Sequence, residues 1–266
     1  MPVPPGGELP GVLICAGLDP SGGAGLIADV RAVDELGGRP VGVVTASTVQ
    51  NTTAVISAEP MSAELVREQL EFLLSDVEIR AVKIGLTGST DIVVSISQAL
   101  ALTSAPVVWD PVLRPSRGDV AFIDSRFDDA IHALLPHLTL VTPNAEELAL
   151  LTGTPLASVS EATTLGERLA ARLGVAVLVK GGHLGGDESI DVLCHATPAG
   201  RSEVLRGPRT PGGEHVHGTG CALSSAIATH LARGADLVEA CRMAKAYVAR
   251  KIAAPARPGR GASAVV

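Results

Sequence analysis

The sequence predicts a single α/β domain with helices on both faces of a mostly parallel sheet. Short apolar runs alternate along the chain with helical stretches of about ten to fifteen residues, which is typical of β-α-β units. The apolar runs are continuous, as expected of strands that are covered on both faces. The 266-residue chain has no linker in its middle, so we expect one three-layer domain over residues 11–266, after a flexible tail over residues 1–10.

The alternation begins directly after the tail. The apolar run Val12–Cys15 predicts a buried strand, and the glycine-rich loop after it leads into a helix at about 26–36. A second strand is expected at 41–45. Ser62 is a good N-cap for a helix that ends near Leu74. Further periodic runs predict strands at 81–84 and 106–109 and a helix at 91–102.

The second half of the chain continues the same pattern. Helices are expected at 126–135, 145–151 and 160–173, and strands at 139–141 and 175–179. The more polar runs 190–194 and 204–206 predict an antiparallel pair at a sheet edge, followed by helices at 219–232 and 237–252. The pattern is lost after Pro255, so this last segment is expected to be loose.

Composition and charge exclude several classes of protein. Hydrophobic residues make up 46% of the chain but aromatic residues only 2%, so the core must be aliphatic. The net charge of −7 argues against nucleic-acid binding, which requires clustered Lys and Arg. The four cysteines are widely spaced, which favours reduced thiols. No signal peptide or membrane-spanning run is recognised, so we expect a cytoplasmic protein that does not bind membranes.

Several polar groups directly follow predicted strands. They are Asp110, Asn144, Lys180 and the glycine loop at 17–25. In open α/β sheets, ligands bind in the crevice outside the carboxyl ends of the strands. These groups are therefore expected to face one crevice.

The glycine loop formally fits a dinucleotide fingerprint through Gly23, Gly25 and Ala28. That site also needs an acidic residue about 20 residues further on, and none is present there. A Walker A loop is excluded because the chain has no Gly-Lys dipeptide. The loop either binds a ligand or only allows the helix to pack close to the strand. Asp29, one turn into the helix, either complements the helix dipole or points at that ligand.

A second glycine motif, Gly218-Thr219-Gly220, opens a helix and precedes Cys221. Glycines at a helix start leave backbone N–H groups available for an anion. A thiol in the first turn of a helix is expected to have a lowered pKa, which favours thiolate. Alternatively, Cys221 is a small buried hydrophobic residue.

Two further motifs suit phosphate chemistry. Asn144 and Glu147 either form a helix cap or, in the case of Glu147, organise Mg²⁺ through water, and Asp110 can serve the same ion. Lys180, with Gly181-Gly182-His183 after it, either ends its strand in solvent or reaches a transferred phosphate. The histidines do not form a convincing metal set. The order of these motifs predicts phosphoryl transfer without a Walker loop.

The chain resembles the hydroxymethylpyrimidine/phosphomethylpyrimidine kinases of thiamine biosynthesis, in the ribokinase-like superfamily. The resemblance runs in family order over nearly the whole chain. Its motifs are AGLDPSGGAGLIAD (16–29), TVQNT (48–52), KIG (83–85), WDPV (109–112), VTPNAEE (141–147), VLVKGGH (177–183) and HGTGCALSSAIA (217–228). Most ribokinase relatives carry Asp where this chain has Cys221, and cysteine marks the pyrimidine and pyridoxal kinase branch.

The resemblance implies a role for each motif. Substrate would be held by Gly17, Asp29, Gln50 and Leu86. Gly218, Thr219 and Gly220 would form an anion hole, with Cys221 as base and Lys180 at the transferred phosphate. ATP and Mg²⁺ would be served by Asn144, Glu147, Lys180 and Asp110, the metal by Asp110 and Glu147. A homodimer is also expected.

The chain departs from the family pattern at a few positions. Leu86 stands where Met is frequent, which is a near-isosteric change. Arg114 or Arg117 is expected to replace a lysine of the loop after WDPV. Two alternatives stay open on the sequence alone, namely a pyridoxal kinase of the same branch and a non-catalytic nucleotide-sensing protein that has kept the fold.

Overall fold

A computed structural model describes residues 8–113, 126–182, 187–196 and 202–265. These residues contain a nine-stranded sheet in the order β3-β2-β1-β4-β5-β6-β7-β8-β9. Its strands are β1 (Gly11–Leu18), β2 (Arg39–Gln50), β3 (Val55–Pro60), β4 (Ile79–Ile84), β5 (Val107–Trp109), β6 (Leu138–Val141), β7 (Ala176–Val179), β8 (Glu188–Cys194) and β9 (Ser202–Pro208). The six strands β2, β1, β4, β5, β6 and β7 run parallel. β3, β8 and β9 add antiparallel edges.

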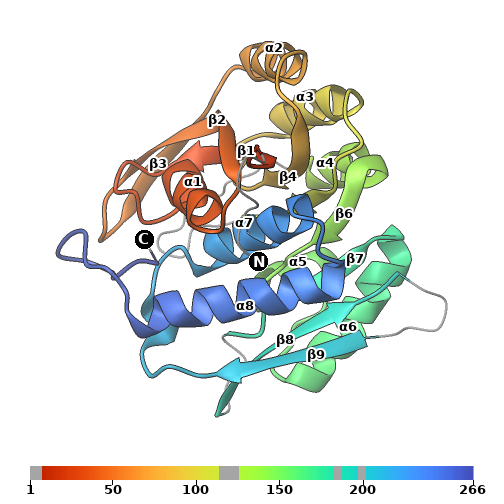
Figure 1. The fold of residues 1–266 in the computed structure, drawn as a ribbon. Coiled ribbons are helices and arrows are strands. Elements are labelled where there is room, and N and C mark those ends of the chain that lie inside the picture. The colour runs from red at the N-terminus through yellow and green to blue at the C-terminus, as the bar shows by residue number, and fades with distance from the viewer. Residues whose placement is uncertain (1–7, 114–125, 183–186, 197–201, 266) are drawn as a thin grey trace.

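Helices cover both faces of this sheet (Figure 1). They are α1 (Gly25–Glu35), α2 (Ala63–Leu74), α3 (Thr90–Leu100), α4 (Phe127–Leu134), α5 (Ala145–Thr152), α6 (Val159–Leu173), α7 (Thr219–Ala232) and α8 (Leu237–Ala253), with short 3₁₀ turns at Leu135–His137 and Gly213–His215. The predicted α/β class, with a mostly parallel sheet between helices, is confirmed.

Side-chain alternation along β1 divides the core in two. Val12, Ile14 and Ala16 pack with α1, α7 and α8 on one face. Leu13 and Cys15 belong to the cluster on the other face, against α2 to α6. Successive side chains of a strand point to opposite faces, so a strand in the middle of three layers must be apolar throughout. This explains the continuous apolar runs in the sequence.

The prediction was wrong in two regions, the β2–β3 edge of the sheet and the segment after Pro255. β2 continues to Gln50 instead of ending at residue 45, and it forms a hairpin with β3, which was not predicted. β3 is only partly buried and carries Ser57 and Glu59, so its pattern is weak. The segment after Pro255 is not loose, because Ala264 and Val265 are buried and hydrogen-bonded to the body of the domain. The expected N-terminal tail lies mostly outside the described residues.

The helix caps follow the predicted chemistry. The Ser62 side chain accepts a hydrogen bond from the Leu65 N–H at the start of α2. α7 differs, because its N-cap is Gly218 in the left-handed region, at φ +82°. No helix among the described residues has the length and apolar character needed to cross a membrane.

Candidate active site

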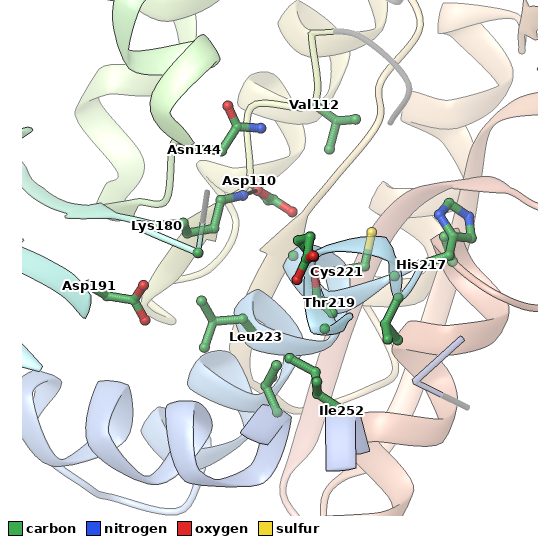
Figure 2. A pocket seen from close by; sticks show the side chains of 18 of the residues that line it. Asp110, Val112, Asn144, Lys180, Asp191, His217, Thr219, Cys221, Leu223 and Ile252 are labelled. Carbon is green, nitrogen blue, oxygen red and sulfur yellow. Dashed lines mark hydrogen bonds and ion pairs between the residues drawn. The ribbon is translucent and has the colours of Figure 1, made fainter. Parts of the chain in front are cut away.

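A cavity of about 880 Å³ opens at the carboxyl ends of the parallel strands, over the first turn of α7. Its wall joins segments that are far apart in the sequence, as the strand-end rule predicts. Of the residues predicted for the site, Gly17, Gln50, Leu86, Asp110, Asn144, Glu147, Lys180, Gly218, Thr219, Gly220 and Cys221 line this cavity, and Asp29 does not. In Figure 2, Cys221 lies between the Lys180–Asp110 pair and His217.

Lys180 and two carboxylates form a charged cluster on one side of Cys221. Lys180 Nζ lies 2.6 Å from Asp110 Oδ1 and 3.7 Å from Glu147 Oε2. The Thr142 hydroxyl donates to Asp110 Oδ1 at 3.2 Å. Burial alone would lower the pKa of Lys180, but Asp110 and Glu147 together raise it. Lys180 is therefore a charged ammonium inside the cavity and does not extend into solvent.

Asn144 and Glu147 form a complete capping box at the start of α5. The Asn144 side chain accepts from the Glu147 N–H at 2.9 Å, and Glu147 Oε2 accepts from the Asn144 N–H at 2.7 Å. The cap does not exclude a second role, because Glu147 also lines the cavity beside Lys180. Burial raises the pKa of Glu147 to about 7, although Lys180 opposes this shift.

The helix start at Gly218–Gly220 faces the charged cluster. A Cβ on Gly218 would lie 2.1 Å from the Gly23 carbonyl oxygen, and φ is positive, so only glycine fits there. A Cβ on Gly220 would lie 3.3 Å from Lys180 Nζ and 3.7 Å from Asp110 Oδ2. Backbone N–H groups and an ammonium thus converge on one position, and this combination attracts an anion.

The expectation of a lowered pKa for the Cys221 thiol is wrong. Burial raises the pKa of its thiol to about 11, with Lys83 opposing the rise and Asp29 and Asp110 adding to it. The expected lowering by the helix N-terminus is therefore outweighed in this structure. The helix end is visible in the sequence, whereas the burial of the thiol and the charges of Asp29 and Asp110 depend on distant segments.

Asp29 belongs to a buried ion pair. Its side chain is fully buried below the cavity, where its two oxygens bind Lys83 Nζ at 2.6 Å and the Ser225 hydroxyl at 2.8 Å. In this structure the Asp29 side chain does not reach the cavity, and its contact with substrate stays a prediction. Sequence reasoning missed the partner, Lys83, which lines the cavity floor. A lysine in the apolar run predicted as the strand 81–84 was the available signal, since charged residues are almost never fully buried without a partner.

The other end of the cavity is apolar with a polar rim. Leu86 packs on Gly17, where a Cβ would lie only 2.7 Å from Leu86 Cδ2. Gln50 Nε2 lies 3.2 Å from His217 Nε2, which is itself 3.4 Å from Asp19 Oδ2. Burial would raise the pKa of Asp19, but hydrogen bonds from His217 and Ser21 outweigh it and lower the pKa. This end suits a flat, partly polar ring.

Comparisons with known proteins decide the family. Residues 19–266 match the phosphomethylpyrimidine kinase family. The chain belongs to this family. It is 40% identical to the hydroxymethylpyrimidine/phosphomethylpyrimidine kinase of Streptomyces coelicolor over 248 residues, which cover 92% of this chain and 89% of the relative.

Two solved structures support the assignment. The phosphomethylpyrimidine kinase of Clostridium difficile 630 is 32% identical with a TM-score of 0.76, covering 92% of this chain and all of that one. The pyridoxal kinase of Staphylococcus aureus in complex with ADP is 28% identical with a TM-score of 0.87, covering 98% and 94%. The predicted family, ribokinase-like fold and phosphotransferase class are confirmed.

Some predicted residues cannot be placed. Arg114, Arg117 and His183 lie outside the described residues. Within the described part of the chain, no group of three or more His, Cys, Asp or Glu side chains is arranged to hold a metal ion.

Proposed function

We propose that this phosphomethylpyrimidine kinase transfers the γ-phosphoryl group of ATP to hydroxymethylpyrimidine and then to its monophosphate, giving the diphosphate for thiamine biosynthesis. The observation that carries the proposal is the cavity in which Cys221 and the Gly218–Gly220 helix start separate an apolar, ring-sized end from a charged end. This arrangement brings a hydroxyl, a phosphate and a thiol to the same position.

The ring is selected at the end formed by Gly17, Gln50 and Leu86. The Gln50 amide can both donate and accept a hydrogen bond, which suits the edge of an aminopyrimidine. Leu86 packs against one face of the ring. The hydroxymethyl group then points toward Cys221.

The triphosphate occupies the charged end, beside Lys180 and Asn144. The Lys180 ammonium and the N–H groups at the start of α7 offset negative charge on the moving phosphoryl group, which is the main demand of this reaction. Asp110 and Glu147 would hold Mg²⁺, because carboxylate oxygens are its preferred ligands. Two protein carboxylates would leave positions on such an ion for phosphate and water. The ion would supply further charge neutralisation on the phosphates.

In the chemical step, the substrate hydroxyl oxygen forms a bond to the γ-phosphorus, and the bond from that phosphorus to the bridging oxygen breaks. ADP leaves with the bridging oxygen. The hydroxyl proton passes to the Cys221 sulfur, which acts as the base. Because the resting thiol has a pKa of about 11, the reactive thiolate is a minor species at neutral pH.

The product assay tests the whole proposal. Purified protein with excess Mg-ATP and hydroxymethylpyrimidine is followed over time by mass spectrometry. We expect monophosphate first and diphosphate later. Monophosphate alone at long times would leave a single-step kinase, and no product would leave the nucleotide-sensing alternative.

Pyridoxal is the competing substrate in the same assay, because the pyridoxal kinase structure has the higher TM-score. We expect turnover of pyridoxal to be slower than that of hydroxymethylpyrimidine at equal concentration. A higher kcat/KM for pyridoxal would reverse the substrate assignment.

Replacing Gln50 by Ala is expected to weaken pyrimidine binding by about 1–3 kcal/mol, since a buried polar partner is left unpaired. Nucleotide binding should hardly change, because Gln50 lies at the other end of the cavity from Lys180. Calorimetric titration with each ligand measures both effects. Equal losses for the two ligands would move Gln50 out of the ring pocket.

Replacing Gly220 by Val is expected to lower turnover by about a hundredfold, the usual loss when a site for developing negative charge is damaged. The added side chain would enter the space between the helix start and Lys180. Gly220→Ala, whose single Cβ meets only the flexible end of Lys180, should lose less. Normal activity of the Val variant at an unchanged melting temperature would contradict the anion-hole assignment.

A further inference from the structure

Three segments from distant parts of the chain line the ring end of the cavity or directly adjoin residues that line it. They are the glycine loop 19–25, the hairpin turn 51–54 that follows Gln50, and the start of α7 at 217–221. The sheet fixes where β1 and β2 end but not how the turns beyond them are placed. Residues 256–265, here called the strap, contact all three segments.

The strap binds the backbone directly before the anion hole. The His217 N–H donates to the Ser263 carbonyl at 2.8 Å, and the Val265 N–H donates to the His217 carbonyl at 3.2 Å. Both backbone groups of His217 are thus held by the strap. The next residue is Gly218, the N-cap of α7.

The strap also binds the hairpin that carries Gln50. The Ala262 N–H donates to the Thr52 carbonyl at 2.9 Å, and the Gly261 N–H donates to the Thr52 hydroxyl at 3.1 Å. A Cβ on Gly259 or Gly261 would lie 2.5 Å or 2.0 Å from Thr52 atoms. The glycines in the sequence G-R-G therefore allow two backbones to approach closely.

The strap is anchored at both ends. Ala256 and Ala264 exchange two backbone hydrogen bonds of 2.9 Å, which close the segment on itself just after α8. Ala264 and Val265 are only 1% and 4% exposed. They pack so closely on Gly23 and Gly218, respectively, that a Cβ on either glycine would lie 3.3 Å from the facing side chain. Figure 1 shows the chain end on the side of β3 and the start of α7.

The side chain of His217 extends this connection into the cavity. It lies within 3.2 Å of Gln50 and 3.4 Å of Asp19, so the residue fixed by the strap also touches the hairpin and the glycine loop. All ten residues of the strap are described by the structure, and none of them lines the cavity. Any effect of the strap on catalysis must therefore pass through the residues it holds.

We propose that the strap positions the anion-hole amides and the Gln50 hairpin relative to each other, without touching substrate. The inference rests on the proposed function for its kinetic consequence only. Its positioning residues are those whose backbone groups bind Thr52 and His217, namely Ala262, Ser263 and Val265. The strap acts on the pyrimidine end and leaves the nucleotide end unchanged.

Two substitutions remove single backbone donors from the strap. Val265→Pro deletes the N–H that binds His217, and Ala262→Pro deletes the N–H that binds Thr52. Arg260→Ala is the matched control, because Arg260 is an exposed residue of the same segment. For each variant, kcat and KM are measured separately for hydroxymethylpyrimidine and for ATP.

We expect Val265→Pro to lower kcat by about tenfold and Ala262→Pro to raise the pyrimidine KM by about as much, the scale of one lost hydrogen bond. The ATP KM should stay within about twofold, and Arg260→Ala should match the original protein. A merely structural strap would change both substrates alike, in step with the melting temperature. That outcome, or unchanged kinetics, would overturn the proposal.

Hydrogen exchange provides a readout that needs no substrate. We expect the amides of residues 217–222 to exchange about tenfold faster in Val265→Pro than in Arg260→Ala, since local opening becomes easier. Equal exchange in the two variants would also overturn the proposal. If the original protein phosphorylates no pyrimidine, the proposed function fails while this comparison still decides the role of the strap.

Discussion

Replacing Cys221 by Ala is expected to lower turnover by roughly two to four orders of magnitude, the usual range for loss of a general base. The thiol lies between the charged cluster of Lys180 and Asp110 and the ring end of the cavity. ATP affinity should change little. Steady-state kinetics at saturating Mg-ATP measures the effect.

The pKa of Cys221 makes this prediction more specific. With a resting value of about 11, the thiolate fraction grows with each step in pH from 7 to 10. Turnover of the original protein should therefore rise over this range, and turnover of Cys221→Ala should not. Cys241→Ala is the control, because Cys241 is buried in the α8 core and does not line the cavity. Identical pH profiles for the original protein and Cys221→Ala would return Cys221 to a packing role.

The sequence predicted the parallel part of the fold well because that part follows from local patterns. Continuous apolar strands such as Val12–Cys15 and Val175–Val179 can only be buried on both faces. Because ligands bind at the carboxyl ends of parallel strands, Asp110, Asn144 and Lys180 could be predicted to share one cavity. These inferences depend on the spacing of apolar residues and on the order of the motifs along the chain. Both can be read from a single sequence.

The failures concern contacts between segments that are distant in the sequence. Apolar residues do not recur at a regular spacing in the strap. The segment is ordered by backbone hydrogen bonds to Thr52 and His217, which leave no pattern in the sequence. Burial is the main cause of the raised pKa of Cys221, and Asp29 and Asp110, which lie far from it along the chain, add to it. For Asp29, the resemblance implied a substrate contact, and the ion pair with Lys83 on β4 could not be predicted from the helix that carries Asp29.

That partner, Lys83, carries the largest expected effect on stability. Lys83→Met is expected to lower the free energy of unfolding by about 3–5 kcal/mol, the usual loss when one member of a buried ion pair is removed. Lys83 and Asp29 are both fully buried and 2.6 Å apart. Burial would lower the pKa of Lys83, but the Asp29 carboxylate raises it, so the ammonium stays charged. Without it, Asp29 would retain the Ser225 hydroxyl, a neutral partner.

The matched variant removes the second charge as well. Asp29→Asn combined with Lys83→Met leaves no unpaired charge, and the double variant should regain much of the stability lost by Lys83→Met. Denaturant unfolding of the two single variants, the double variant and the original protein completes the cycle. Additive losses, with no recovery in the double variant, would show that the two groups do not act as a pair.

Stability and activity should separate in the double variant. Lys83 lines the floor of the cavity and opposes the rise of the Cys221 pKa, whereas Asp29 adds to that rise. Removing both charges cancels opposing influences on the thiol, but it also removes a fixed cation from beneath the helix start that we propose binds the phosphoryl group. We therefore expect the double variant to fold but to turn over more slowly than the original protein. Full activity together with restored stability would confine the Lys83–Asp29 pair to the fold.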